Sequence, residues 1–226
     1  CGALASGLGG RVATAGVRGL GAVGRDSEVE GVGGGLLHGY ATPKNEQQVA
    51  AILREELEVP VSASHAVLPE FREFERTATT VVDAYVTPTI DSYVGRLTDR
   101  AAAEGIPEPR IMQSNGGIAS ADTVRTHAVG TALSGPAAGV IGAGRAARAV
   151  SGTDGLPGFV TFDMGGTSSD VSLIRDGDAE RTTDTTIDGI PIRTPMVDLN
   201  TIGSAGGSVA WVHSGGAPRV GPRPGR

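Results

Sequence analysis

The sequence is poor in the features on which secreted and membrane proteins depend. Its single cysteine, Cys1, excludes a disulfide within the chain and fits a reducing compartment. No uninterrupted apolar run reaches membrane-spanning length, and the first residues lack the charged-then-apolar order of a signal peptide. These absences predict a soluble, cytoplasmic protein without a membrane segment.

Basic clusters and the signatures of several common catalytic sites are also missing. The net charge is −6 and there is no basic run, so a nucleic-acid surface is not expected. The sequence has no G-x-x-x-x-G-K-[ST] loop and no G-x-S-x-G elbow. The histidines show no metal-ligand spacing; they are His38, His65, His127 and His213. The chemistry must therefore come from another kind of site.

The ends of the chain look unlike a complete domain. Residues 1–35 are rich in Gly, Ala and Arg without a sustained period, which predicts irregular structure. The run Gly19–Gly24 satisfies G-x-G-x-x-G, but no strand precedes it and no apolar helix follows it, so no dinucleotide site is expected there. The chain does not start with Met, and residues 223–226 supply no closing element. We expect a fragment whose core covers residues 36–222.

Two helices are predicted in the first half of this core. The first runs from Pro43 to about Glu58, with Thr42 as N-cap, and its apolar face contains Val49, Ile52, Leu53 and Leu57. The second is the longest helical stretch, from Glu70 toward Glu104, with Gly105 and Pro107 closing it and Pro88 kinking or splitting it. Its apolar stripe, beside a solvated charged face, comprises Phe71, Phe74, Ala78, Val81 and Tyr85, and continues beyond Pro88 with Ile90, Tyr93, Leu97 and Ala101.

Several strands and turns follow from the remaining patterns. Residues 59–64 suit a short edge strand, and residues 110–113 suit a central strand. Residues 175–178 form a strong tight-turn signal, with strands expected over 179–183 and 190–193. The small residues Gly135, Gly139 and Gly142 predict a helix to about Val150 that packs closely against a neighbouring element.

The most informative stretch is 159–174, in which two apolar strands flank a polar loop. Gly165 and Gly166 lack a Cβ, so the backbone can take positive φ there and bring its N–H groups within hydrogen-bonding distance of anionic oxygens. The hydroxyls of Thr167, Ser168 and Ser169 add further donors. This composition predicts a phosphate-binding β-hairpin.

The acids of the loop suit a hydrated Mg²⁺, because this ion keeps most of its waters and needs only one or two carboxylates. Asp163 ends the first strand and would hold the ion, while Asp170 would either support it or fix the turn. The residues alone leave a second interpretation open, in which Gly-Gly and Asp serve only the geometry of a hairpin.

The loop also carries a family resemblance. Residues 163–171, Asp-Met-Gly-Gly-Thr-Ser-Ser-Asp-Val, resemble the signature of the hydantoinase A/5-oxoprolinase family. Residues 112–117 and 133–140 match in the expected order, and residues 202–210 are close. The resemblance covers roughly Leu36 to Gly221. It implies an α/β fold of the actin-like ATPase (ribonuclease H-like) superfold, with a mixed sheet, packed helices and the phosphate-binding hairpin.

The resemblance implies an ATP-dependent hydrolase that opens a cyclic amide, of the 5-oxoproline or hydantoin type, by phosphorylating the ring carbonyl. Its cofactors would be ATP and Mg²⁺, and a hydantoinase B-like subunit or domain would be its partner. Asp163 and Asn115 would be catalytic, and Asp163 and Asp170 would hold the metal ion. The nucleotide would contact Gly165, Gly166, Thr167, Ser168, Ser134, Gly135, Gly206 and Gly207.

Some features keep other interpretations open. Asn115 followed by Gly is also a common turn, and the N-terminus of the helix at Ser134 is an anion site on general grounds. The family's second D-x-G-G-T loop is absent from this sequence, and Ser204 and Ala205 depart from the family's glycine-rich run. The alternatives are a non-catalytic nucleotide-binding or assembly fragment and an acetone carboxylase-type subunit. The fragment alone is not expected to turn over substrate.

Overall fold

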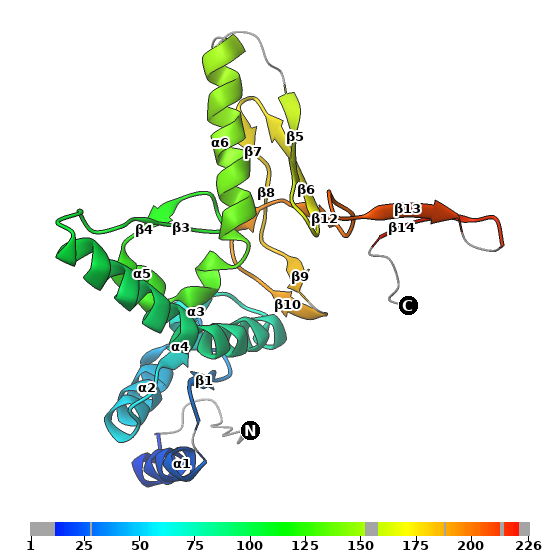
Figure 1. Ribbon diagram of the computed structural model, residues 1–226. Coiled ribbons are helices and arrows are strands. Elements are labelled where there is room, and N and C mark those ends of the chain that lie inside the picture. The colour runs from blue at the N-terminus through cyan, green and yellow to red at the C-terminus, as the bar shows by residue number, and fades with distance from the viewer. Residues whose placement is uncertain (1–11, 28, 152–157, 188, 213–214, 222–226) are drawn as a thin grey trace. The chain divides into compact units, whose positions relative to one another are not determined.

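The computed structural model describes residues 12–27, 29–151, 158–187, 189–212 and 215–221 (Figure 1). Its contacts divide the chain into two compact units. Unit 1 contains Cys1–Ile111, Ile118–Ala132 and Thr183–Pro195, and unit 2 contains Met112–Gly117, Leu133–Thr182 and Met196–Arg226. The chain therefore enters each unit more than once. Residues 1–11 and the predicted tail 223–226 lie outside the described residues.

Unit 1 is mostly helical and centres on its longest helix. The helices are α1 (Thr14–Asp26), α2 (Lys44–Glu56), α3 (Ser64–Val67), α4 (Glu73–Ala103), α5 (Ala121–Thr126) and the 3-10 helix η1 (Ala128–Thr131). The strands β1 (Val32–Gly34) and β2 (Val61–Ala63) pair in parallel, and β9 (Thr185–Ile187) pairs antiparallel with β10 (Ile190–Ile192). Helix α4 contacts both β1 and β2, and it also packs against α3, α5, η1 and β10.

Helix α1 falls in the segment that was predicted to be irregular, so that prediction is wrong for residues 14–26. The glycines of the Gly19–Gly24 run lie inside this helix and let it approach α2. A Cβ added at Gly21 would lie 2.8 Å from the Cβ of Glu56. Val17 is buried with the apolar face of α2, which includes Ile52 and Leu53. The G-x-G-x-x-G pattern therefore serves helix packing.

The two helices predicted in the first half of the core are present. Helix α2 has the predicted apolar face, but its N-cap is Pro43, which makes no side-chain cap, so the prediction of Thr42 as N-cap is wrong. Helix α4 runs through Pro88 without interruption. It ends as predicted at Gly105, which has a φ of +69°, and the Ile106 N–H donates to the Ala101 carbonyl.

The first half of the apolar stripe predicted for α4 does not face the core, whereas beyond Pro88 Ala101 is buried and Ile90 packs against a buried cluster. Phe74 is 73% exposed and Tyr85 is 83% exposed, and Phe71 and Val81 are exposed as well. The opposite, polar face is buried instead, and its residues are Arg76, Thr79, Thr80, Asp83 and Thr87. Each of the three threonine hydroxyls donates to the carbonyl four residues earlier, which satisfies it within the helix.

Unit 2 combines one long helix, α6 (Ser134–Ser151), with short antiparallel strands. Its main sheet has the order β12-β6-β5, with β7 also paired to β6; these strands are β5 (Gly158–Met164), β6 (Ser169–Arg175), β7 (Asp178–Ala179) and β12 (Asn200–Ile202). Two further pairs join β8 (Arg181–Thr182) to β11 (Met196–Val197) and β13 (Val209–Val212) to β14 (Pro218–Gly221). Helix α6 runs alongside β5 and β6 (Figure 1). The core of unit 2 contains Ala137, Val140, Ile174 and Val197.

Helices and sheets are thus mixed, as predicted, but the main sheet is antiparallel in every described pairing. The tight turn between β6 and β7 is confirmed, with positive φ at Asp176 and Gly177. The prediction of a central strand over 110–113 is wrong, because among the described residues β3 (Ile111–Met112) pairs only with β4 (Ile118–Ala119). In the described part of the chain, no helix combines the length and apolarity needed to cross a bilayer.

Candidate functional site

The predicted hairpin forms, and its turn is closed by a backbone hydrogen bond. β5 and β6 pair from Gly158 with Arg175 to Met164 with Ser169, and the Gly165 N–H donates to the Ser168 carbonyl at 3.0 Å. Neither Gly165 nor Gly166 has a positive φ, so the turn does not use the left-handed conformation that is open to glycine. The Gly165 N–H is also already engaged in the turn.

The two glycines serve the close approach of a second loop. The Gly206 N–H donates to the Gly165 carbonyl at 3.1 Å, and the Gly207 N–H donates to the Gly166 carbonyl at 3.0 Å. A Cβ at Gly207 would lie 2.6 Å from the Gly166 oxygen, a distance that no side chain tolerates. The structure thus brings residues 202–208 directly against the hairpin turn. This contact joins two of the four predicted motifs.

A pair of carboxylates lies at the base of the turn. Asp163 and Asp170 are direct cross-strand partners in the β5–β6 register. Thr201 donates a 2.6 Å hydrogen bond to Asp170 Oδ1, whereas Asp163 is exposed and has no cationic partner among the described residues. Like charges directly opposite each other in a sheet are unfavourable unless a cation lies between them.

The carboxylate oxygens of this pair are ligands that Mg²⁺ prefers, but they do not by themselves complete the coordination of an ion. The described residues contain no group of three His, Cys, Asp or Glu placed to hold a metal ion. Two carboxylates with waters and phosphate oxygens are nevertheless the usual ligands of nucleotide-bound Mg²⁺. The arrangement of Asp163 and Asp170 therefore fits an ion that arrives with a phosphate.

Helix α6 packs against this corner through glycine. A Cβ at Gly139 would lie 3.3 Å from Asp163 Oδ2, and a Cβ at Gly144 would lie 3.0 Å from the Ile174 side chain. Gly135 and Gly142, which were predicted to share this role, have no atom within 4 Å of an added Cβ. The close helix–sheet contact is therefore confirmed, but through Gly139 and Gly144.

The remaining predicted residues belong to the same unit. Asn115 Oδ1 accepts from the Gly117 N–H at 2.7 Å, which is the turn that was held open as its alternative role. Its loop packs on α6, since a Cβ at Gly116 would lie 2.9 Å from Ile141. Ser134 is the first residue of α6 and is partly buried, while Gly135 is exposed. Unit 2 thus contains all four motifs. That Asn115 and Ser134 act together with the carboxylate pair stays a prediction.

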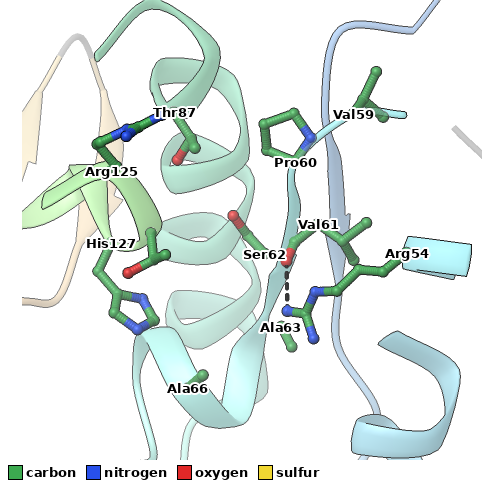
Figure 2. Close-up of a pocket in the computed structure, with 11 residues that line it drawn as sticks. Arg54, Val59, Pro60, Val61, Ser62, Ala63, Ala66, Thr87, Arg125 and His127 are labelled. Carbon is green, nitrogen blue, oxygen red and sulfur yellow. Dashed lines mark hydrogen bonds between the residues drawn. The ribbon is translucent and has the colours of Figure 1, made fainter. Parts of the chain in front are cut away.

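Unit 1 contains a pocket that the sequence did not suggest. Its volume is about 550 Å³, and β2, α3, α4 and the end of α5 contribute to its walls (Figure 2). The polar side chains that line it are Arg54, Ser62, Thr87, Arg125, Thr126 and His127. Arg54 donates to the Val61 carbonyl at 2.8 Å, as the dashed line in Figure 2 shows. None of the predicted site residues lines this pocket.

Sequence reasoning also missed a buried polar cluster in unit 1. Glu46 of α2 is 2% exposed, and its carboxylate accepts from Ser64 and from both the ring and the backbone N–H of His65. Arg76 of α4 is 1% exposed and donates to Ser64 Oγ. The available signal was positional, because Ser64 ends a predicted strand and His65 directly follows it. Spacing rules for metal ligands do not detect such a cluster.

Burial of the Glu46 carboxyl would by itself raise its pKa. The hydrogen bonds from the His65 and Leu36 backbone N–H groups, the His65 ring and the Ser64 hydroxyl outweigh this effect and lower the pKa below its ordinary value of 4.5. Glu46 is therefore an ionised carboxylate at neutral pH.

Three relatives have comparable sequences or folds. The alpha subunit of caprolactamase from Pseudomonas jessenii is 36% identical over 201 residues, which cover 88% of this chain and 28% of the relative. A crystal structure of ATP-dependent caprolactamase from the same species superposes with a TM-score of 0.77 at 34% identity, covering 92% of this chain and 30% of that one.

The other two relatives carry different names. 5-Oxoprolinase 1 of Arabidopsis thaliana is 38% identical over 188 residues, covering 83% of this chain and 14% of the relative. A nucleotide-free structure of acetone carboxylase, an enzyme of ATP-dependent acetone carboxylation, superposes with a TM-score of 0.74 at 28% identity and covers 93% of this chain and 30% of that one. The chain thus spans less than a third of the length of each relative.

These likenesses place the chain in a class of proteins that includes ATP-dependent hydrolases and carboxylases. The family model described as hydantoinase/oxoprolinase matches residues 76–226. The chain belongs to the hydantoinase/oxoprolinase family, which confirms the resemblance carried by the hairpin loop.

Proposed function

We propose that this chain supplies the nucleotide site of an ATP-dependent enzyme that opens a cyclic amide, and that its fold belongs to the actin-like ATPase superfold. The observation that carries the proposal is the corner of unit 2 where the Asp163–Asp170 pair meets the two glycine loops and Gly139 of α6. The names of two relatives, a caprolactamase and a 5-oxoprolinase, support the substrate class.

The donors left for phosphate differ from those that the sequence suggested. The N–H groups of Gly165, Gly206 and Gly207 hold the loops together, so they position the site and do not bind the ligand in this arrangement. In the described part of the chain, the Gly166 N–H has no partner, and Thr167 at the tip of the turn is exposed. Together with the Ser168 hydroxyl, these groups would contact phosphate oxygens.

Further donors come from the other two motifs. Helix α6 begins at Ser134, and the first N–H groups of a helix have no acceptor within it and lie at the positive end of its dipole. Asn115 uses Oδ1 in its turn, which leaves its amide nitrogen as a donor to the nucleotide or to the ring. Mg²⁺, when bound by Asp163 with Asp170 beside it, would neutralise phosphate charge.

The proposed reaction begins with transfer of the γ-phosphoryl group of ATP to the carbonyl oxygen of the ring, which releases ADP. A water molecule then adds to the activated carbon and the carbon–nitrogen bond breaks, leaving a free amine and an acyl phosphate. A second water molecule releases phosphate from the acyl group. A hydantoinase B-like subunit or domain is the proposed partner, because relatives are named as subunits.

The test is ATP hydrolysis by the full-length protein with its partner, measured with and without 5-oxoproline or caprolactam. We expect ring-dependent hydrolysis in the wild type and a loss of at least a hundredfold, on the order of 2.7 kcal/mol, in Asp163→Asn. Asp178→Asn is the matched control, because that side chain is 97% exposed and lies outside the loops. A loss below about tenfold in Asp163→Asn would remove Asp163 from the metal role.

A second candidate function is ATP-dependent carboxylation of a ketone, which the likeness to acetone carboxylase favours. The same phosphate site would then serve to phosphorylate the carbonyl oxygen of a ketone in place of that of a cyclic amide. ATP hydrolysis that requires bicarbonate and a ketone, and ignores cyclic amides, would select this function. A nucleotide-binding or assembly module without catalysis would bind ATP and show neither stimulation.

A further inference from the structure

Three polar side chains lie in one row across the main sheet of unit 2. Thr201 of β12 is the direct partner of Asp170 of β6, and Asp170 is the direct partner of Asp163 of β5. Directly opposite residues of antiparallel strands place their side chains on the same face of the sheet. The carboxylate pair therefore has a neighbour on the third strand that the proposed metal site does not yet include.

The two carboxylates of this row have different surroundings. Thr201 Oγ1 donates to Asp170 Oδ1 at 2.6 Å. Asp163 lies at the other end of the row against α6, where a Cβ added at Gly139 would lie 3.3 Å from Asp163 Oδ2. In the described part of the chain, no hydrogen bond to the Asp163 carboxylate or to Asp170 Oδ2 is found. One carboxylate is thus held by a hydroxyl, and the other is not.

The direction of the hydrogen bond follows from the chemistry of the two groups. An ionised carboxylate only accepts, so the proton comes from the Thr201 hydroxyl. A hydrogen bond to a charged acceptor is stronger than one between neutral groups. This bond occupies one oxygen of Asp170 and leaves Oδ2 as the oxygen that can face a cation.

The backbone of β12 is held on both sides of Thr201. The strand pairs with β6 over its whole length. After its end, the Ser169 hydroxyl donates to the Ser204 carbonyl at 2.7 Å. Before its start, the Ser172 hydroxyl donates to the Asp198 carbonyl at 2.7 Å. Both serines are buried in β6, so the Thr201 hydroxyl is placed beside the carboxylate pair without any movement of the strand.

A pair of like charges needs this kind of support. Asp163 and Asp170 repel each other across the strands unless a cation lies between them. A donor on Asp170 offsets part of this repulsion and keeps the carboxylate in one orientation before an ion binds. Hydrogen bonds that orient a metal ligand from outside typically change metal affinity by about 10–100-fold.

We propose that Thr201 is a positioning residue for the Mg²⁺ of the nucleotide, and that it acts by holding Oδ1 of Asp170 so that Oδ2 faces the ion bound by Asp163. This inference rests on the proposed function. In this role Thr201 touches neither the phosphates nor the ring, and its whole effect passes through Asp170. Threonine is a common strand residue, so its type alone does not predict this role.

The experiment measures Mn²⁺, a paramagnetic probe for the Mg²⁺ site, binding to the full-length protein with ADP by electron paramagnetic resonance. We expect Thr201→Val to weaken Mn²⁺ binding about tenfold, because valine keeps the β-branched shape and lacks the hydroxyl. Thr201→Ser keeps the donor and should stay within about twofold of the wild type. Thr186→Val is the matched control, since Thr186 is an exposed strand residue of β9.

Ring-dependent ATP hydrolysis gives a second measurement. In Thr201→Val the Mg²⁺ concentration for half-maximal rate should rise about tenfold, while kcat at saturating Mg²⁺ stays within about twofold of the wild type. A merely structural role would lower Tm and kcat, leave the Mg²⁺ requirement unchanged and give no recovery in Thr201→Ser. That pattern overturns the proposal.

A double-mutant cycle tests whether Thr201 acts through Asp170. If it does, adding Thr201→Val to Asp170→Ala has no further effect on Mn²⁺ affinity. A loss from Thr201→Val that is equally large in both backgrounds contradicts the proposal. If Thr201→Val does not fold, Thr201→Ala takes its place with the same expected results.

The outcomes also separate this inference from the proposed function. A wild type that binds neither ADP nor Mn²⁺ would overturn both together. A wild type whose Mn²⁺ binding is lost in Asp163→Asn and unchanged in Thr201→Val would overturn only the role of Thr201.

Discussion

At the scale of single residues, the buried charges of unit 1 are balanced through shared hydrogen bonds. Glu46 and Arg76 are both almost fully buried, and both bond to the Ser64 hydroxyl. They also bind the two sides of one backbone residue, since Glu46 accepts from the Leu36 N–H and Arg76 donates to the Leu36 carbonyl at 2.8 Å. The loop that follows β1 is therefore held by two buried charges.

Glu46→Gln tests this arrangement through its pH dependence. The pKa of Glu46 is lowered in the folded state, so its stabilising contribution is complete above the ordinary value of 4.5 and is lost as pH falls through the lowered value. We expect the variant to lose about 2–4 kcal/mol in unfolding free energy at pH 7, because an amide nitrogen then faces donors. The difference from the wild type should shrink below pH 4.5.

Urea denaturation at several pH values measures this effect. Glu55→Gln is the matched control, since Glu55 lies on the same helix and is exposed. A Glu46→Gln deficit of constant size from pH 7 to acid pH would contradict the role of the ionised carboxylate.

Gly207 provides a second test at residue scale. A Cβ there would lie 2.6 Å from the Gly166 carbonyl oxygen, and the backbone on both sides is tied by hydrogen bonds. We expect Gly207→Ala to force the two loops apart, lowering the unfolding free energy by about 1–3 kcal/mol and weakening ATP binding. Thermal unfolding and nucleotide titration measure both effects.

Gly203→Ala is the control for Gly207, because no atom lies within 4 Å of its added Cβ and its φ is not in the left-handed region. We expect it to behave like the wild type. Equal behaviour of the two variants would show that contact between the loops does not shape the site.

At the scale of elements, α4 shows how tertiary context overrides a helical pattern. Its residues Phe74, Val81 and Tyr85 are exposed. The buried polar residues of the helix, which packs against β1, β2 and η1, are Arg76, Thr79, Thr80, Asp83 and Thr87. The buried polar groups are satisfied one by one. Asp83, fully buried, accepts from Ser62 Oγ at 2.6 Å and from the Val129 N–H at 2.9 Å.

This inversion predicts which substitutions on α4 matter for stability. Asp83→Ala leaves the Ser62 hydroxyl and the Val129 N–H buried without an acceptor, so we expect a loss of about 2–5 kcal/mol. Tyr85→Ser, two residues later on the exposed face, should stay within about 0.5 kcal/mol of the wild type. Chemical denaturation of both variants measures the two losses in unfolding free energy. A larger loss in Tyr85→Ser than in Asp83→Ala would show that the apolar stripe packs in the core, as the sequence predicted.

The hairpin β5–β6 is the element that sequence reasoning captured best. Its apolar strands, its polar turn and the tight turn after it depend on residues that are neighbours in the sequence, so local patterns suffice to find them. Its glycines also have a role that the local pattern did not predict. Gly165 and Gly166 accept hydrogen bonds from residues some forty positions later, and no local pattern encodes that contact.

At the scale of the whole molecule, the chain passes back and forth between two compact units with separate cores. Unit 1 packs Val17 with the apolar face of α2, and a further cluster joins Val94, Ala121 and Val124. Unit 2 packs α6 on β6 through Ala137 and Ile174. From the sequence, the length of the chain indicated only that it could bury one large core or two small ones. The order of segments along the chain does not show which of them pack together in one core.

The sequence by itself determined the family, the order of the four motifs, the hairpin and the helices α2, α4 and α6, since these depend on residue types at short spacing. Only the tertiary structure decided that residues 202–208 hydrogen-bond to the hairpin turn, that α4 buries its polar face, and that Glu46 meets Ser64 and His65. The physical reason is the same in each case. A hydrogen bond between residues far apart in the sequence depends on the path of the chain in space. The local preferences of the residues do not determine that path.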